Sequence, residues 1–275
     1  MKKIKIIPII TTLILITLGI ITLFPVYIAI LNSFKTQPEL YKSVLALPGK
    51  INFDNYINAI NKMNFLKITF NTFYITLISV VGIIIVGSLA GYKLAKTSGK
   101  VSAFFFLFFT SSMLIPFQTI MIPLYRLAKN MHLTGSKTGI TLIYMGLGIN
   151  MAIFLYHGFS KSIPKELEEA ALIDGCNEAQ MFFKIIFPLL KPITATIAIL
   201  DVLWIWNDFM LPLIMITNPK NYTLVLETNM FFGKYTVDWP SILAGLVCTW
   251  IPVLIFYSLF QKYIVKGIVS GAVKG

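Results

Sequence analysis

Long apolar runs dominate the chain and are separated by shorter polar segments. Six runs are long enough to cross the hydrocarbon core of a bilayer, which needs about 20 helical residues. They cover approximately residues 6–31, 68–92, 101–125, 138–157, 192–216 and 240–261. Backbone amides cannot stay unpaired in lipid, and the runs are too long and too evenly apolar for barrel strands. The pattern therefore predicts an all-α polytopic membrane protein with six transmembrane helices in a single domain covering residues 1–275.

Composition agrees with this pattern. Hydrophobic residues make up 57% of the 275 residues and charged residues only 12%, which is typical of membrane proteins and excludes an ordinary soluble domain. The second run also contains Gly87-Ser-Leu-Ala-Gly91, a small-residue surface that allows another helix to approach closely.

The start of the chain has two interpretations. A basic head, MKKIK, followed by an apolar run is also the pattern of a signal peptide. Here the apolar run continues to Leu31, and no small-residue cleavage site follows it. We therefore expect an uncleaved first span.

The net charge is +12. In a membrane protein the positions of the lysines are more informative than a possible affinity for nucleic acid, because cytoplasmic loops near membrane spans collect Lys and Arg. An N-terminus in the cytoplasm places 13 of the 23 basic residues on that side, in the shorter connections. These are Lys2, Lys3, Lys5, Lys93, Lys96, Lys100, Lys161, Lys165, Lys184, Lys191, Lys262, Lys266 and Lys274. The bias predicts a membrane protein with both termini in the cytoplasm.

Residues for independent chemistry are scarce. There is no G-x-x-x-x-G-K-[ST] sequence that would cradle a nucleotide phosphate, so the chain cannot hydrolyse ATP alone. Two histidines, His132 and His157, and two separated cysteines, Cys176 and Cys248, form no metal-ligand or nucleophile pattern. We expect no catalytic residue, no metal site and no cofactor bound by this chain.

The fifth apolar run carries two carboxylates, which are costly in a membrane unless they face protein or water. Asp201, Trp204 and Asp208 are spaced so that they share one helical stripe. A carboxylate beside an aromatic ring can hold a sugar, so this stripe and the neighbouring Asn207 are a candidate substrate path. The alternative is structural: Asp208 caps or pairs with a neighbouring helix where Pro212 interrupts the backbone ladder.

The connection 217–239 mixes turn residues with aromatic ones, including Tyr222, Phe231 and Phe232. Aromatic side chains beside a span usually belong to the interfacial belt of the membrane. A loop of this length can equally reach a partner outside, so both interpretations stay open.

The segment of about 160–190 interrupts the apolar pattern with charges. Residues 165–172 are predicted to form one helix, in which Lys165 can pair with Glu169, and residues 178–187 a second. Gly175 between them permits a sharp bend because it accepts positive φ without penalty. Such a helix–turn–helix can rest in lipid headgroups or dock in a groove on another protein.

This segment resembles the EAA signature of membrane subunits of binding-protein-dependent ABC importers. The matching positions are Glu169, Ala170, Ala171, Gly175, Ile185 and Pro188, with Phe187 where the signature has leucine. Other short matches resemble the carbohydrate branch, and within it the MalG-type permeases. They include Asn32-Ser-Phe-Lys-Thr, Ser162-Ile-Pro-Lys-Glu-Leu-Glu-Glu, Trp206-Asn-Asp-Phe and Gly271-Ala-Val-Lys-Gly275.

The resemblance implies a type I importer permease fold with coupling helices between spans 4 and 5. It implies a second homologous permease as heterodimer partner, a cytoplasmic ATPase dimer that binds ATP and Mg²⁺, and an extracellular sugar-binding protein. Glu169, with the bend at Gly175, would dock in the ATPase; Gly271 and Lys274 would touch it as well. The loop 217–239, with Tyr222, Phe231 and Phe232, would contact the binding protein.

Two other classes of protein fit the sequence less well. A self-sufficient secondary carrier would use Asp201 or Asp208 for ion coupling, but such carriers usually show an internal repeat and none is found here. An intramembrane enzyme would need the histidine and cysteine patterns that the chain lacks. The resemblance therefore implies a permease subunit in a bacterial cell membrane that transports a sugar, most simply an oligosaccharide.

Overall fold

The computed structural model describes residues 6–234 and 238–272, and every regular element in these ranges is helical. The α-helices are α1 (Ile6–Ser33), α2 (Gln37–Lys42), α3 (Asp54–Lys62), α4 (Phe65–Lys96), α5 (Lys100–Ser112), α6 (Phe117–Asn130), α7 (Lys137–Ser160), α8 (Lys165–Ile173), α9 (Glu178–Met181), α10 (Phe187–Leu189), α11 (Lys191–Asn207), α12 (Met210–Met215), α13 (Leu224–Lys234) and α14 (Trp239–Ala272). A π-helical turn, Phe182–Ile186, and a 3₁₀ turn, Pro219–Asn221, complete the set.

The chain divides into two compact units. The first combines Met1–Leu66 with Glu227–Leu254, and the second combines Lys67–Leu226 with Ile255–Gly275. Both functional candidates described below, the charged helix–turn–helix and the acidic stripe, lie in the second unit.

In the first unit, the loop after α1 is organised around a buried lysine. Lys35 is 1% exposed, and its ammonium group donates to Asn32 Oδ1 at 2.8 Å and to the Ser43 carbonyl at 2.9 Å. Asn55 from α3 donates to the carbonyls of Ser33 and Lys35, both at 2.8 Å. Burial of a charge is tolerated only when hydrogen bonds replace its water, so these contacts make the loop a defined structure.

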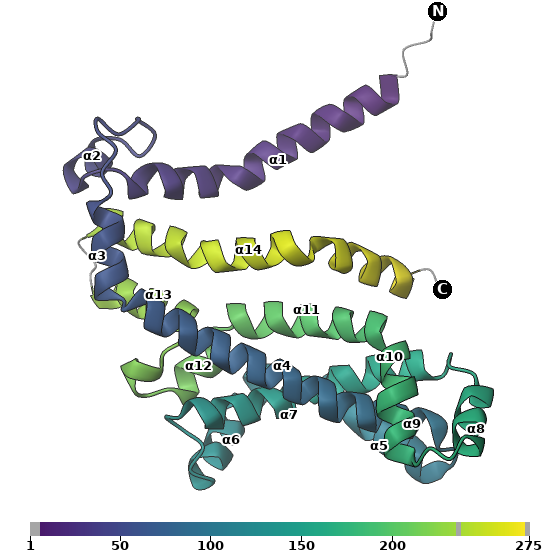
Figure 1. Ribbon diagram of the computed structural model, residues 1–275. Helices are drawn as coiled ribbons and strands as arrows, with labels where there is room; N and C mark the ends of the chain where they lie inside the picture. The colour runs from purple at the N-terminus through teal and green to yellow at the C-terminus, as the bar shows by residue number, and fades with distance from the viewer. Residues whose placement is uncertain (1–5, 235–237, 273–275) are drawn as a thin grey trace, which may run out of the picture. The chain divides into compact units, whose positions relative to one another are not determined.

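In the second unit, long helices run side by side, with α7 packed against α5 and α11 (Figure 1). The predicted small-residue surface on α4 is confirmed: a Cβ on Gly87 would lie 2.6 Å from the Ala152 Cβ, and a Cβ on Gly91 would lie 2.6 Å from the Tyr156 Cβ. Glycine therefore permits the close approach of α4 and α7.

Four described helices are long and apolar enough to cross a membrane, and two bent pairs raise the number to six if each pair is one span. The predicted span 101–125 is not one continuous helix, because α5 and α6 meet at an angle of 103°. Pro116 lies at the bend with extended backbone, φ −60° and ψ 137°. It has no N–H for an α-helical bond and disfavours helix at the preceding residue.

The predicted span 192–216 is also interrupted. α11 ends at Asn207, Asp208 is extended with φ −72° and ψ 136°, and α12 begins at Met210. Non-helical backbone at membrane depth is tolerated where other protein groups satisfy it. The acidic stripe thus lies at the end of a helix rather than in the middle of one.

Candidate functional site

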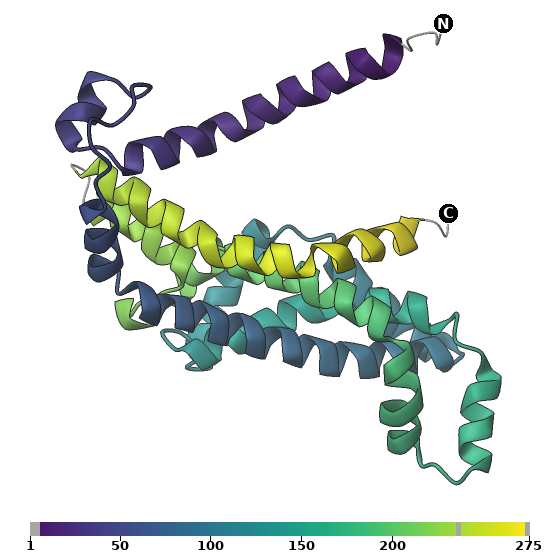
Figure 2. The same ribbon diagram turned by 45° about the horizontal axis from the view of Figure 1, so that its top comes forward.

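The charged segment forms two short helices, α8 and α9, joined by a tight turn, as predicted (Figure 2). We call Lys165–Leu190 the elbow. Gly175 in the turn has φ +82°, which confirms the predicted positive-φ bend. Asn177 begins α9 by accepting from the Gln180 N–H at 2.8 Å, and Gln180 Oε1 accepts from the Asn177 N–H. This capping box fixes the point at which the second helix starts.

The sequence predicts a regular α-helix over 178–187 for the second half of the elbow, and the structure differs from this prediction. The helix widens into the π-helical turn Phe182–Ile186 before α10. Pro188 explains the difference, because it has no N–H and its ring would clash with the carbonyl of Lys184 in an α-helix. The wider turn lets the Phe187 N–H bond to the Phe182 carbonyl instead.

The elbow is braced against the end of α4. Lys96 Nζ lies 2.7 Å from Glu168 Oε1 and also donates to the Ile163 carbonyl at 2.7 Å. The rings of Tyr92 and Phe182 lie 5.4 Å apart between centroids. An ion pair, a charged hydrogen bond and a ring contact hold the elbow in place.

The outer face of the elbow is uncovered. Glu169, Ala170, Leu172 and Ile173 are exposed, and Ile173 is 85% exposed. Ala171, the third residue of the signature, is instead buried at 2% exposed and packs inward. The predicted Lys165–Glu169 pair is absent from the ion pairs of the described residues. Glu169 thus keeps its carboxylate free of an ion pair within the described chain.

The rest of the signature lies where the second half of the elbow joins α11. Ile185 and Pro188 are half-buried, between the buried Ile186 and Leu190. These residues support the elbow rather than present a surface.

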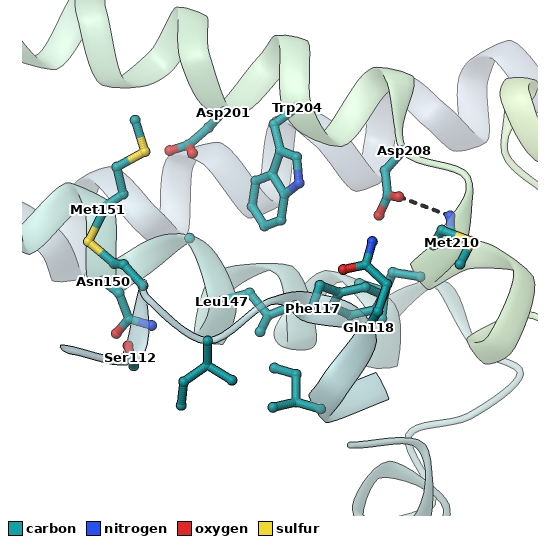
Figure 3. A pocket seen from close by; sticks show the side chains of 15 residues that line it. Ser112, Phe117, Gln118, Leu147, Asn150, Met151, Asp201, Trp204, Asp208 and Met210 are labelled. Atoms are coloured by element: carbon teal, nitrogen blue, oxygen red, sulfur yellow. Dashed lines mark hydrogen bonds between the residues drawn. The ribbon is translucent and has the colours of Figure 1, made fainter. Parts of the chain in front are cut away.

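A cavity of about 670 Å³ lies beside the acidic stripe. It is lined by side chains of α7, α11, α12 and the bend between α5 and α6, and Asp201, Trp204 and Asp208 all face it (Figure 3). Asp201 and Trp204 lie on α11 as predicted, whereas Asp208 faces the same cavity from the extended residue after that helix. Asn207 is outside: it is exposed, and its amide donates to the Leu203 carbonyl at 2.8 Å.

Asp208 has structural partners on both oxygens. Tyr144, on α7, donates to Oδ2 at 2.9 Å, and the Met210 N–H donates to Oδ1 at 3.0 Å. The carboxylate thus satisfies the backbone where α11 stops and α12 begins. This is the structural role that the sequence left open for Asp208.

Trp204 is held in the cavity by its neighbours. Its ring meets the ring of Tyr144 edge-on, with centroids 5.5 Å apart. A Cβ on Gly148 would lie 3.3 Å from the Trp204 ring and 2.5 Å from Ile83 Cδ1, so only glycine leaves room for this packing. The indole remains 40% exposed.

Several residues of this site were not expected from the sequence. Tyr144, Gly148, Gln118 and Asn150 come from other apolar runs. The only signal for them was a polar or small residue within a span, which does not reveal its partner.

The start of the connection 217–239 is fixed rather than free. The Asn71 amide donates to the carbonyls of Lys220 and Tyr222 at 3.0 and 3.1 Å, and the Leu224 N–H donates to Thr72 Oγ1 at 2.8 Å. Phe231 and Phe232 are on α13, but their side chains lie outside the described residues. Gly271 belongs to the backbone of α14, and Lys274 lies outside the described residues.

Comparison with known proteins agrees with this architecture. A family model described as "Binding-protein-dependent transport system inner membrane component" matches residues 83–270. The probable starch degradation products transport system permease protein AmyC of Thermoanaerobacterium thermosulfurigenes is 40% identical over 274 residues, covering 100% of both chains. The melibiose/raffinose/stachyose import permease protein MelC of Bacillus subtilis (strain 168) is 37% identical over 252 residues, covering 91% of both chains.

The same fold is found in a solved structure. A bacterial ABC transporter involved in the import of the acidic polysaccharide alginate matches with a TM-score of 0.83 and 24% identity, over 96% of this chain and 98% of that chain. This chain therefore has the type I importer permease fold and belongs to the binding-protein-dependent transport system inner membrane components, the membrane permease subunits of ABC importers, whose ATPase is a separate subunit.

Proposed function

We propose that this permease forms, together with a second homologous permease, the path by which an oligosaccharide enters a bacterial cell. The support comes from the relatives, whose names refer to starch degradation products and to melibiose, raffinose and stachyose. A sugar-binding protein outside the cell would deliver the cargo, and ATP with Mg²⁺ on a separate ATPase dimer would drive transport.

The observation that carries the proposal is the braced elbow with an uncovered outer face. Ile173 exposes apolar surface beside the exposed carboxylate of Glu169. A helix face of this kind fits a groove on a partner, in which Glu169 would meet a basic residue. Because Glu168 fastens the elbow to α4, a push by the ATPase is transmitted to a membrane helix.

Orientation follows from the elbow. If the elbow meets a cytoplasmic ATPase, Lys93, Lys96 and Lys184 lie on the same side, in agreement with the basic bias of cytoplasmic loops. Both termini then lie in the cytoplasm, where Gly271 and Lys274 would add a contact to the ATPase. The connection 217–239 lies outside, where Tyr222, Phe231 and Phe232 would face the binding protein.

The substrate path is proposed to pass the cavity beside Trp204. Asp201 and Trp204 would then lie next to the cargo. Asp208 would stabilise the cavity wall through its hydrogen bond with Tyr144. Asn207 lies outside this cavity and is left out of the proposed path.

The test is to purify the chain from its native host with its partners and to reconstitute the complex in vesicles. We expect sugar uptake that requires ATP, Mg²⁺ and the binding protein together, and cross-links from a Glu169→Cys variant to the ATPase. Uptake driven by an ion gradient without ATP would contradict the proposal, as would cross-links from that position to lipid alone.

A further inference from the structure

The cavity beside Trp204 combines one aromatic face with a few polar groups. Gln118 and Asn150 contribute amides, Asp201 contributes a carboxyl group, and most other lining residues are Met, Ile, Leu or Phe. Its volume of about 670 Å³ is in the range of small-molecule sites. Sugars are held by such surfaces, because one side of the ring is apolar and stacks on an indole while its hydroxyls form hydrogen bonds.

The two carboxyl groups of the stripe differ in their hydrogen-bond partners. Asp208 has a donor on each oxygen. Asp201 is 4% exposed, and its Oδ2 has no hydrogen-bond partner among the described residues. A buried polar atom without a partner costs free energy. A hydroxyl donated by a ligand in the cavity would remove that cost, so Asp201 is the group that is prepared for a ligand.

The cavity wall also contains a flexible side chain. Met151 lines the same cavity as Asp201 (Figure 3). An unbranched thioether side chain changes rotamer easily, so it can move when a ligand enters.

The charge of the lining restricts which sugar can enter. None of the described residues that line the cavity is a lysine, arginine or histidine. An anionic sugar would therefore bring a charge into a largely apolar site without a counter-charge, which is costly. The fold also occurs in an importer of an acidic polysaccharide, so the fold itself does not set the charge of the cargo.

We propose that this subunit carries its own binding site for one uncharged sugar unit, which stacks on Trp204, donates a hydroxyl to Asp201 and is selected against acidic sugars. The proposal rests on the permease function above. It also assigns different roles to the two acidic residues of the stripe. Asp201 binds the cargo, and Asp208 stabilises the wall of the cavity.

The experiment measures sugar binding in the cavity directly. In the assembled complex, with Cys176→Ser and Cys248→Ser, a Met151→Cys variant is labelled with a maleimide, with and without ATP. Maltotriose and raffinose are the uncharged probes, and each is paired with a form in which one primary alcohol is oxidised to a carboxylate. An Asn207→Cys variant outside the cavity is the matched control.

We expect the uncharged probes to slow labelling of Met151→Cys and not of Asn207→Cys, and the carboxylate forms to protect neither. Adding Asp201→Leu, which has no acceptor, should raise the sugar concentration for half-protection by about threefold to tenfold, as expected for the loss of one hydrogen bond. Trp204→Ala should raise it by about threefold to tenfold through lost stacking.

Equal protection by the carboxylate forms would overturn the charge selection. No protection by either uncharged probe, in a complex that still imports it with ATP, would overturn the binding site and leave the permease function standing. Absence of ATP-dependent uptake of any sugar would contradict the proposed function itself.

Discussion

Lys96 at the end of α4 and Glu168 in α8 form an ion pair of 2.7 Å, with side chains only 12% and 17% exposed. Lys93 and Glu178 form a second pair nearby at 3.2 Å, but their side chains are 65% and 80% exposed. The first pair joins α4 to α8 and the second joins α4 to α9, so both connect the elbow to the same membrane helix in different surroundings. Removing one partner of an ion pair costs more free energy when the pair is largely shielded from water.

The first prediction compares these two pairs. Lys96→Met should lower the free energy of unfolding by about 1–3 kcal/mol, because it leaves Glu168 unpaired and the Ile163 carbonyl without its donor. Sugar taken up per ATP hydrolysed should also fall, since the elbow is no longer fastened to α4. Lys93→Met is the control and should change stability by less than about 1 kcal/mol. Equal effects of both variants would show that the shielded pair is not the brace.

The second prediction concerns Glu169, whose carboxylate is exposed and free of an ion pair within the described chain. Glu169→Lys should leave the unfolding midpoint unchanged but abolish sugar-stimulated ATP hydrolysis, because a charge of the wrong sign would face the ATPase. Glu166→Lys, on the same helix and also exposed, is the control. Both variants are measured by ATPase assay and by co-purification with the ATPase. Normal coupling in Glu169→Lys would contradict the docking role.

The third prediction concerns the bend of the elbow. Gly175 has φ +82° and no atom within 4 Å of an added Cβ, so a side chain there meets strain but no clash. Gly175→Ala should therefore cost only about 1–2 kcal/mol, the usual penalty for a left-handed residue. Gly175→Asn, which tolerates this conformation better, should restore part of the stability and of the coupling. Equal loss of stability and coupling in both variants would indicate that the room for a side chain, and not the left-handed backbone conformation, sets the cost.

Much of this architecture follows from local pattern. Runs of apolar residues, the bend at Gly175 and the shared stripe of Asp201 and Trp204 depend on spacing within one segment, which the sequence displays. The partners Tyr144 for Asp208 and Lys96 for Glu168 come from distant segments. Which polar side chains meet depends on how the helices pack, and an apolar pattern does not encode that.

The two interruptions of predicted spans have the same origin. A hydropathy window sees 101–125 as one apolar run, although the backbone turns by 103° before α6. The sequence shows Pro116 in that run, but proline in a membrane helix gives a kink, a break or neither, depending on what satisfies the freed carbonyls. The break at Asp208 is similar, because its carboxylate provides the bond that the helix gives up.

The fourth prediction tests the packing around Trp204. Gly148→Ala would place a Cβ 2.5 Å from Ile83 Cδ1 and 3.3 Å from the Trp204 ring, so it should lower stability by about 1–3 kcal/mol through overpacking. Gly146→Ala, on the same helix with nothing within 4 Å, should be neutral or stabilising by up to about 1 kcal/mol. Thermal unfolding of the assembled complex distinguishes them. If Gly146→Ala were the more harmful change, the described packing would be wrong.

The last prediction concerns pH and the loop after α1. The Glu39 carboxylate accepts from the Thr36 N–H at 2.8 Å, the Thr36 hydroxyl at 2.9 Å and the Gly49 N–H at 3.0 Å. The backbone hydrogen bond from Thr36, followed by the other two, lowers the pKa of Glu39 below its ordinary value. A carboxylate with a lowered folded pKa stabilises the fold above its unfolded pKa, and this contribution is lost as pH falls through the folded pKa.

Hydrogen exchange at the Thr36 and Gly49 amides, corrected for its intrinsic pH dependence, measures this effect. In the wild type, protection should be constant at neutral pH and should decline as the pH falls below about 4, near the unfolded value for glutamate. Glu39→Gln imitates the protonated state, so it should exchange faster at pH 7 and show no further decline in acid. Asp54→Asn, an exposed carboxylate at the start of α3, is the control. An acid-dependent decline that persists in Glu39→Gln would assign the transition to another group, because the glutamine has no proton to gain in this range.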